Sequence, residues 1–136
     1  MSATAPVSSP ARVRADDGAR TVIVTGAGTG LGLETALHLA GQGMRVYATV
    51  RNPAQEPRIR EAARERGIDR ADLDVVRLDL TDRESIETAL EHVVGEAGGV
   101  YGLVNNGGIG LRGCLEDVTD EEIRAVFEAN IFGTIA

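Results

Sequence analysis

Residues 21–32 read Thr-Val-Ile-Val-Thr-Gly-Ala-Gly-Thr-Gly-Leu-Gly. The first five residues form a β-branched apolar run of the kind that is buried in a parallel sheet. The glycines that follow predict a tight turn, because glycine adopts backbone conformations that other residues avoid. Apolar residues then recur at helical spacing until Gly41 ends the pattern, and they are Leu31, Leu33, Ala36, Leu37, Leu39 and Ala40. The stretch therefore predicts a strand, a glycine turn and a helix.

The same alternation continues along the chain. Further strands are predicted at residues 45–50, 74–78 and 101–105, and helices at 54–66, 82–97 and from about 120 onward. This alternation indicates an α/β fold with a doubly wound, Rossmann-like parallel sheet. The right-handed crossover rule favours the strand order 3-2-1-4. The last helix has no stop signal and the fourth strand would be an unpaired edge, so we expect only part of such a sheet.

Two short patterns predict where helices begin. Thr81-Asp82-Arg83-Glu84 has the form of a capping box, in which a threonine accepts from the helix and a glutamate bonds back to the cap. Thr119 and Glu122 show the same spacing before the last predicted helix. We therefore expect Thr81 and Thr119 to cap these two helices.

Composition excludes several classes of function. The 136 residues are 43% hydrophobic and 26% charged, as in globular proteins. Aromatic residues make up only 3% and the net charge is −7, which disfavours a nucleic-acid partner. One cysteine and two histidines argue against a disulfide and against a metal site. All 14 basic residues are arginine, so this chain holds no lysine for catalysis.

The first residues show no pattern of a targeting signal. Residues 1–19 are rich in Ala, Pro and Ser without periodicity, which predicts a flexible arm before a domain at residues 20–136. They lack the apolar core of a signal peptide. No apolar run approaches the ~20 residues of a membrane span. We therefore expect a cytoplasmic protein without a membrane partner.

The glycine turn has the composition of a phosphate-binding loop. Glycines there let the backbone approach a pyrophosphate, whose charge meets the N–H groups at a helix N-terminus. The strict G-x-G-x-x-G spacing fails, because leucine occupies the third glycine position, whereas T-G-x-x-x-G-x-G fits. A plain strand-to-helix turn is the alternative. On the first interpretation the cofactor-binding residues of this turn are Gly26, Thr29, Gly30, Leu31 and Gly32.

The end of the second predicted strand indicates which dinucleotide binds. NAD binders place an acid ~20 residues past the glycines, on the ribose 2′-hydroxyl. No acid lies within residues 45–53, and Arg51 ends the strand instead. A guanidinium can bind a 2′-phosphate through forked hydrogen bonds, and Thr29 would add a hydroxyl. The pattern favours NADP(H) over NAD(H), with a solvated strand-end charge as the alternative for Arg51.

Two further strand ends carry candidate contacts, since ligands bind at the carboxyl ends of parallel strands. After the third strand, Asp79 can accept from an adenine amino group while Leu80 packs against the ring. Helix capping by Asp79 or Thr81 is the alternative. After the fourth strand, Asn106 can hold the loop by bonding backbone groups, and Gly108 leaves room for a nicotinamide ribose. An ordinary turn is the alternative there.

Taken in this order, the features resemble the short-chain dehydrogenase/reductase family. The resemblance rests on the glycine turn, Asp79, Asn105-Asn106-Gly107-Gly108 and Asn130-Ile131-Phe132-Gly133. Residues 46–51, Val-Tyr-Ala-Thr-Val-Arg, also resemble the NADP(H)-preferring 17β-hydroxysteroid and retinol dehydrogenase branch. The resemblance covers residues 20–136, although Gly107 stands where family members usually carry alanine.

The resemblance implies an oxidoreductase that moves hydride between a nicotinamide and the carbon of a secondary alcohol or ketone. Its members use Asn, Ser, Tyr and Lys, and only Asn130 matches here, as support for a proton-relay water. Neither Tyr47 nor Tyr101 precedes a lysine. We therefore expect the N-terminal, cofactor-binding portion of such an enzyme, inactive by itself, whose parent protein is a homo-oligomer.

The substrate class stays open at this point. Steroid, retinoid, fatty-acyl and sugar-like ketones all suit the reaction that the resemblance implies. Two interpretations outside the enzyme class also stay open. One is a non-catalytic nucleotide-binding or interaction module, and the other is an inactive truncated product.

Overall fold

The computed structural model describes residues 20–136, and the arm predicted at residues 1–19 lies outside them. Four parallel strands form one sheet in the order β3-β2-β1-β4, as predicted. The alternation of strands with helices confirms the doubly wound α/β class. The strands are β1 (Thr21–Val24), β2 (Arg45–Val50), β3 (Leu73–Arg77) and β4 (Gly102–Val104).

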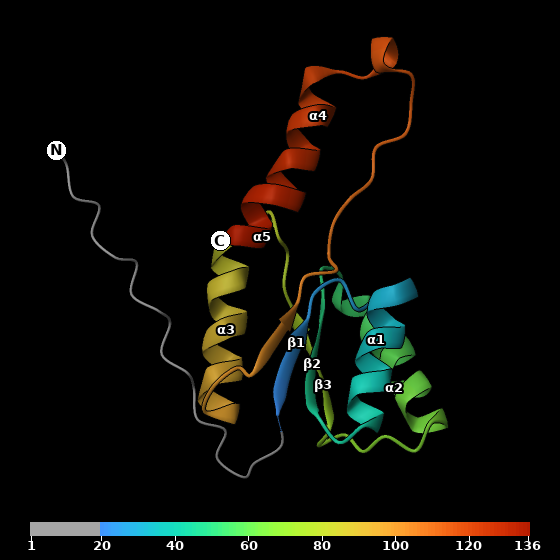
Figure 1. Ribbon diagram of the computed structural model, residues 1–136, viewed down its shortest axis with the longest axis vertical. Coiled ribbons are helices and arrows are strands. Elements are labelled where there is room, and N and C mark those ends of the chain that lie inside the picture. The colour runs from blue at the N-terminus through green and yellow to red at the C-terminus, as the bar shows by residue number, and fades with distance from the viewer. Residues whose placement is uncertain (1–19) are drawn as a thin grey trace, which may run out of the picture.

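Helices cover both faces of the sheet (Figure 1). The helices α1 (Gly30–Gly41) and α2 (Glu56–Glu65) lie on one face, and α3 (Arg83–Ala97) lies on the other. Beyond β4 the chain extends past the carboxyl ends of the strands (Figure 1). This segment contains the 3-10 helix η2 (Leu115–Asp117), α4 (Asp120–Phe127), the π-helix η3 (Glu128–Phe132) and α5 (Gly133–Ile135).

Two apolar layers hold the helices to the sheet. The layer under α1 and α2 is wholly aliphatic, with Val24, Leu37 and Ile59 among its fully buried members. The layer under α3 is smaller and contains Tyr47 packed with Val93. Burial of such side chains is the main favourable contribution to folding, at about 1.5–3 kcal/mol for each large one.

Two predicted helices are divided in the structure. The helix predicted at 54–66 is preceded by the 3-10 turn η1 (Pro53–Gln55), and only then does α2 begin. Asn52 caps this turn, because its Oδ1 accepts from the N–H of Ala54 at 3.0 Å. The helix predicted from about residue 120 is interrupted by the π-helix η3.

Of the two predicted caps, one is confirmed and one is wrong. Thr119 and Glu122 form the reciprocal capping box at the start of α4. At α3, however, the cap is Asp82, whose Oδ1 accepts from the N–H of Ser85 at 3.2 Å. Thr81 does not cap because its N–H and hydroxyl both donate to Oδ1 of Asp79, at 2.9 and 2.8 Å.

Candidate functional site

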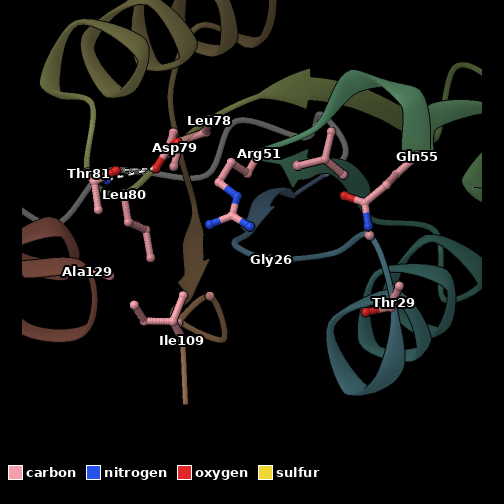
Figure 2. Close-up of a pocket in the computed structure, with 14 residues that line it drawn as sticks. Gly26, Thr29, Arg51, Gln55, Leu78, Asp79, Leu80, Thr81, Ile109 and Ala129 are labelled. Carbon is pink, nitrogen blue, oxygen red and sulfur yellow. Dashed lines mark hydrogen bonds between the residues drawn. The ribbon is translucent and has the colours of Figure 1, made fainter. Parts of the chain in front are cut away.

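A pocket of about 280 Å³ lies where the strands end, at the carboxyl edge of the sheet (Figure 2). The glycine turn after β1, the ends of β2 and β3, the loop after β4 and the π-helix all contribute to it. Among the described residues that line it, the charged ones are Arg51 and Asp79. Of the predicted site residues, Gly26, Thr29, Arg51, Asp79, Leu80 and Gly108 line the pocket, whereas Gly30, Leu31, Gly32, Asn106 and Asn130 lie outside its lining.

Glycine is required at Gly26 in the turn after β1 and at Gly32 in the first turn of α1. Gly26 has φ +65°, and a Cβ there would lie 2.7 Å from the Cα of Gly107. A Cβ on Gly32 would collide with the carbonyl oxygen of Gly26 and the side-chain amide of Asn106. The absence of side chains at these positions therefore brings the first turn of α1 against the loop after β4.

The N-terminus of α1 is open toward the pocket. Thr29 occupies the N-cap position with extended backbone, but its hydroxyl makes no capping hydrogen bond. The first backbone bond of the helix runs from the N–H of Leu33 to the carbonyl of Thr29. The N–H groups of Gly30, Leu31 and Gly32 are thus left without helical partners, which makes this end of the helix suited to an anion. The Leu31 side chain itself is 80% exposed.

Arg51 follows the last residue of β2 and lies between the glycine turn and Asp79 (Figure 2). Within the described part of the chain its guanidinium makes neither a hydrogen bond nor an ion pair, although most other arginines there do. It is exposed and faces the pocket. An unpaired guanidinium at this place can bind a phosphate through two parallel hydrogen bonds.

Asp79 stays charged at neutral pH. Burial alone would raise its pKa, but the N–H and hydroxyl of Thr81, together with the nearby charges of Arg51 and Arg77, hold the pKa of this carboxyl below its ordinary value. Asp79 does not cap α3, so the alternative of a capping role for Asp79 or Thr81 is wrong. Its Oδ1 accepts from Thr81, and Leu80 beside it also lines the pocket.

Thr25 is a site residue whose role the sequence did not indicate. Its Oγ1 accepts from the N–H groups of Asn106 and Gly107, at 3.0 and 2.8 Å, and donates to the carbonyl of Val104 at 3.3 Å. In return the side-chain amide of Asn106 donates to the carbonyls of Thr25 and Gly26, at 3.0 and 3.1 Å. Through these bonds Asn106 joins its loop to the backbone of the glycine turn.

Asn130 forms a two-bond clamp on a pocket residue. Its Oδ1 accepts from the N–H of Ile109 at 2.8 Å, and its Nδ2 donates to the carbonyl of Ile109 at 2.9 Å. It does so from the π-helix η3, an irregular form that occurs frequently at functional sites. The clamp fixes the loop that carries Gly108 and Ile109 along the pocket.

A second polar cluster lies away from this pocket, between β3 and α3. Donor atoms of Asp74, His92 and Glu96 lie within 4.8 Å of one another. Arg60 pairs with Asp74 at 2.6 Å and Arg45 pairs with Glu96 at 3.0 Å, so each carboxylate already has a cationic partner. These ion pairs account for the cluster, and the absence of a metal site stays a prediction.

Comparison with known proteins agrees with the architecture. The sheet order and the glycine turn at its carboxyl edge define a Rossmann-like α/β protein. The family model described as short chain dehydrogenase matches residues 20–136. The chain belongs to this short-chain dehydrogenase/reductase family, as its motifs indicated.

Three individual matches are informative. The chain is 38% identical over 121 residues to 17-beta-hydroxysteroid dehydrogenase type 1 of Homo sapiens, covering 86% of this chain and 36% of that protein. It is similar to a solved actinorhodin polyketide ketoreductase variant with NADPH, with TM-score 0.79, 32% identity, and coverage of 86% and 44%. It is also similar to a gluconate 5-dehydrogenase of Burkholderia cenocepacia in complex with NADP and tartrate, with TM-score 0.72, 26% identity, and coverage of 85% and 44%.

The chain spans only part of these proteins. It covers 33–38% of the length of the first curated relatives that it matches, and under half of the solved chains. In residues 20–136, no helix is both long and apolar enough to cross a membrane.

Proposed function

We propose that residues 20–136 form the N-terminal, cofactor-binding portion of an NADP(H)-dependent short-chain oxidoreductase that acts on a secondary alcohol or ketone. The observation that carries the proposal is the unpaired Arg51 at the end of β2, facing the same pocket as the open N-terminus of α1. One cation and one set of free N–H groups suit a ligand with separate phosphates. The relatives solved with NADP or NADPH support the same cofactor.

Each part of the pocket has a role in this proposal. The N–H groups of Gly30, Leu31 and Gly32 bind the pyrophosphate, with Gly26 bringing the backbone close. Arg51 and the free hydroxyl of Thr29 bind the 2′-phosphate. At the other wall Asp79 accepts from the adenine amino group and Leu80 packs on the ring. Asn106 holds the loop on which Gly108 leaves room for the ribose.

The Tyr and Lys pair that the family resemblance implies for hydride transfer has no match in these 136 residues, which contain no lysine. When bound, the nicotinamide supplies or accepts the hydride at the alcohol or ketone carbon. Asn130 would contribute from this chain, by fixing the loop at Ile109 and supporting a relay water. Tyr47 is fully buried under α3 and Tyr101 precedes β4 at the opposite edge of the sheet, so neither reaches the pocket. The chain alone is therefore proposed to bind cofactor without catalysis.

The whole protein is proposed to be a cytoplasmic homo-oligomer. Its partners in the proposal are the dinucleotide and a small ketone or alcohol, with neither nucleic acid nor membrane. The second candidate is a nucleotide-binding module without enzymatic activity. If the protein is the oxidoreductase, its full-length form contains lysine and reduces ketones. If it is the binding module, its full-length form contains no lysine and does not reduce ketones.

Binding measurements on the 136-residue chain test the cofactor proposal. Titration calorimetry is expected to give saturable binding of NADPH that is stronger than binding of NADH. Arg51→Asp replaces a phosphate ligand with a charge that repels phosphate, so it is expected to weaken NADPH by about 100-fold and NADH by less than about threefold. Equal losses for the two dinucleotides would remove the 2′-phosphate assignment.

A further inference from the structure

Gln55 lies at the rim of the pocket with its polar atoms unused. It is the last residue of η1, which Asn52 holds through its bond to Ala54. Gln55 also occupies the N-cap position of α2, yet its side chain makes no capping bond. In the described part of the chain its carboxamide has no hydrogen-bond partner, although the residue is half-buried. The side chain is thus positioned but not paired.

Gly28 is what allows this position. A Cβ on Gly28 would lie 2.5 Å from three atoms of the Gln55 carboxamide, namely Cδ, Nε2 and Oε1. The amide group therefore covers the space that any other residue would fill. Figure 2 shows the Gln55 side chain directed at the glycine turn, above Thr29. A contact between η1 and the turn after β1 is thus built from these two residues.

The chemistry of the carboxamide matches its neighbours in the pocket. Arg51 supplies a charged donor and Thr29 a free hydroxyl, and both line the pocket with Gln55. A carboxamide adds two N–H donors without adding charge. Three donors of different kinds around one space suit an anion with several oxygens better than they suit a neutral hydroxyl.

We propose that Gln55 is a specificity-determining residue, whose amide N–H donates to the 2′-phosphate of the cofactor beside Arg51. The proposal rests on the proposed function, because it needs a dinucleotide in this pocket. It assigns Gly28 a role as well. The glycine is needed at this position to let the Gln55 carboxamide reach the phosphate, in addition to any approach of its own backbone to the ligand.

The first test compares a nucleotide that carries the phosphate with one that lacks it. Adenosine 2′,5′-bisphosphate and adenosine 5′-monophosphate are titrated against the 136-residue chain by calorimetry. Gln55→Ala is expected to weaken the bisphosphate about fivefold, and Gln55→Glu about thirtyfold, because the glutamate removes the donor and adds repulsion. Both variants are expected to leave the monophosphate within about twofold of the unchanged chain.

The chain offers a matched control. Gln42 is the other glutamine, and it lies exposed at the C-terminal end of α1, far along the helix from the pocket. Gln42→Glu introduces the same charge, so it is expected to leave the preference for the bisphosphate unchanged. A loss with Gln42→Glu equal to the loss with Gln55→Glu would assign the effect to net charge and overturn the proposal.

Gly28→Ala tests the contact itself. The new methyl group would meet the far end of a flexible side chain, so the Gln55 carboxamide moves while the fold persists. The expected loss of bisphosphate affinity is about fivefold, as for Gln55→Ala, and the double variant should lose no more than either single one. Additive losses would mean that the new methyl group obstructs the ligand directly, which overturns the role assigned to Gly28.

The outcomes separate this proposal from the one on which it rests. If the unchanged chain binds neither nucleotide nor NADPH, the proposed function and the role of Gln55 both fail. If the unchanged chain prefers the bisphosphate and Arg51→Asp abolishes that preference while Gln55→Glu does not, the cofactor assignment stands and the role of Gln55 alone is refuted.

Discussion

Thr25 and Thr49 are two buried threonines for which replacement by valine should have opposite effects. The change exchanges a hydroxyl for a methyl group with almost no change of shape. The hydroxyl of Thr25 accepts from the N–H groups of Asn106 and Gly107. The hydroxyl of Thr49 is buried as well, but it has no partner among the described residues. The comparison therefore isolates the hydrogen bonds that join the glycine turn to the loop after β4.

The expected magnitude follows from the bonds that remain after each change. In Thr25→Val the N–H of Asn106 keeps its bond to the carbonyl of Val104 at 3.1 Å, whereas the N–H of Gly107 loses its partner. One part-buried donor left unpaired costs about 2 kcal/mol of unfolding free energy. Thr49→Val removes a buried hydroxyl that is already unpaired, so it should stabilise the chain by about 1 kcal/mol.

Urea unfolding followed by circular dichroism measures both changes. With a slope of about 2 kcal/mol per molar, the midpoint should fall by about 1 M in Thr25→Val and rise by about 0.5 M in Thr49→Val. Thr25→Ser serves as a control, because it keeps the hydroxyl and loses about 1 kcal/mol of methyl burial. Hydrogen exchange at Gly107 should be fast in the valine variant and remain slow in the serine variant.

Two results would refute the role assigned to the hydrogen bonds of Thr25. The first is a shift of the midpoint in the same direction and by similar amounts in Thr25→Val and Thr49→Val. The exchange of hydroxyl for methyl, and not the loss of hydrogen bonds, would then determine the change in unfolding free energy. Slow exchange at Gly107 in Thr25→Val would refute it independently, because the N–H would have found another partner.

Two further predictions concern charge and capping. Burial raises the pKa of Asp74, but hydrogen bonds from Arg60 and a backbone N–H lower it by more than burial raises it. The folded pKa of Asp74 therefore lies below the ordinary value. Its stabilising contribution is present above the unfolded pKa of about 3.9 and is lost as the pH falls through the folded pKa. Asp74→Asn should therefore flatten the decline of unfolding free energy below about pH 4, and parallel pH curves for the variant and the unchanged chain would contradict this. At the start of α3, Asp82→Ala should cost about 1 kcal/mol and Thr81→Ala less than about half of that, as urea midpoints would show. A larger cost for Thr81→Ala would restore Thr81 as the cap.

Local patterns along the chain were sufficient to predict the architecture. The β-branched run at residues 21–24 and the helical spacing after it indicated a strand and a helix, and the alternation that followed indicated strand order 3-2-1-4. The right-handed rule restricts each connection between parallel strands, and 3-2-1-4 is a common order in doubly wound sheets, so local patterns were informative about the whole sheet. The capping box at Thr119 was predictable for the same reason, since all its bonds lie within four residues.

Competition between nearby polar groups was not predictable from spacing. Thr81 and Asp82 both precede α3 and both are common caps, and the choice depended on Asp79, which binds Thr81 and leaves Asp82 for the helix. In the same way, the turn η1, which Asn52 caps, precedes α2 although the helical pattern runs through both. In each case the folded backbone determines which of the possible hydrogen bonds forms.

The sequence alone indicated the order of the strands, the place of the glycine turn and the edge of the sheet where a ligand would lie, because alternating strands and helices are typical of the doubly wound fold and its parallel strands end at one edge. Only the tertiary structure decided which side chains meet there. It joins Thr25 to the loop at Asn106, some 80 residues away, and lays Gln55 on Gly28. Such contacts depend on the packing of whole helices against the sheet. The spacing of residues along the chain does not show which of them will lie close together in space.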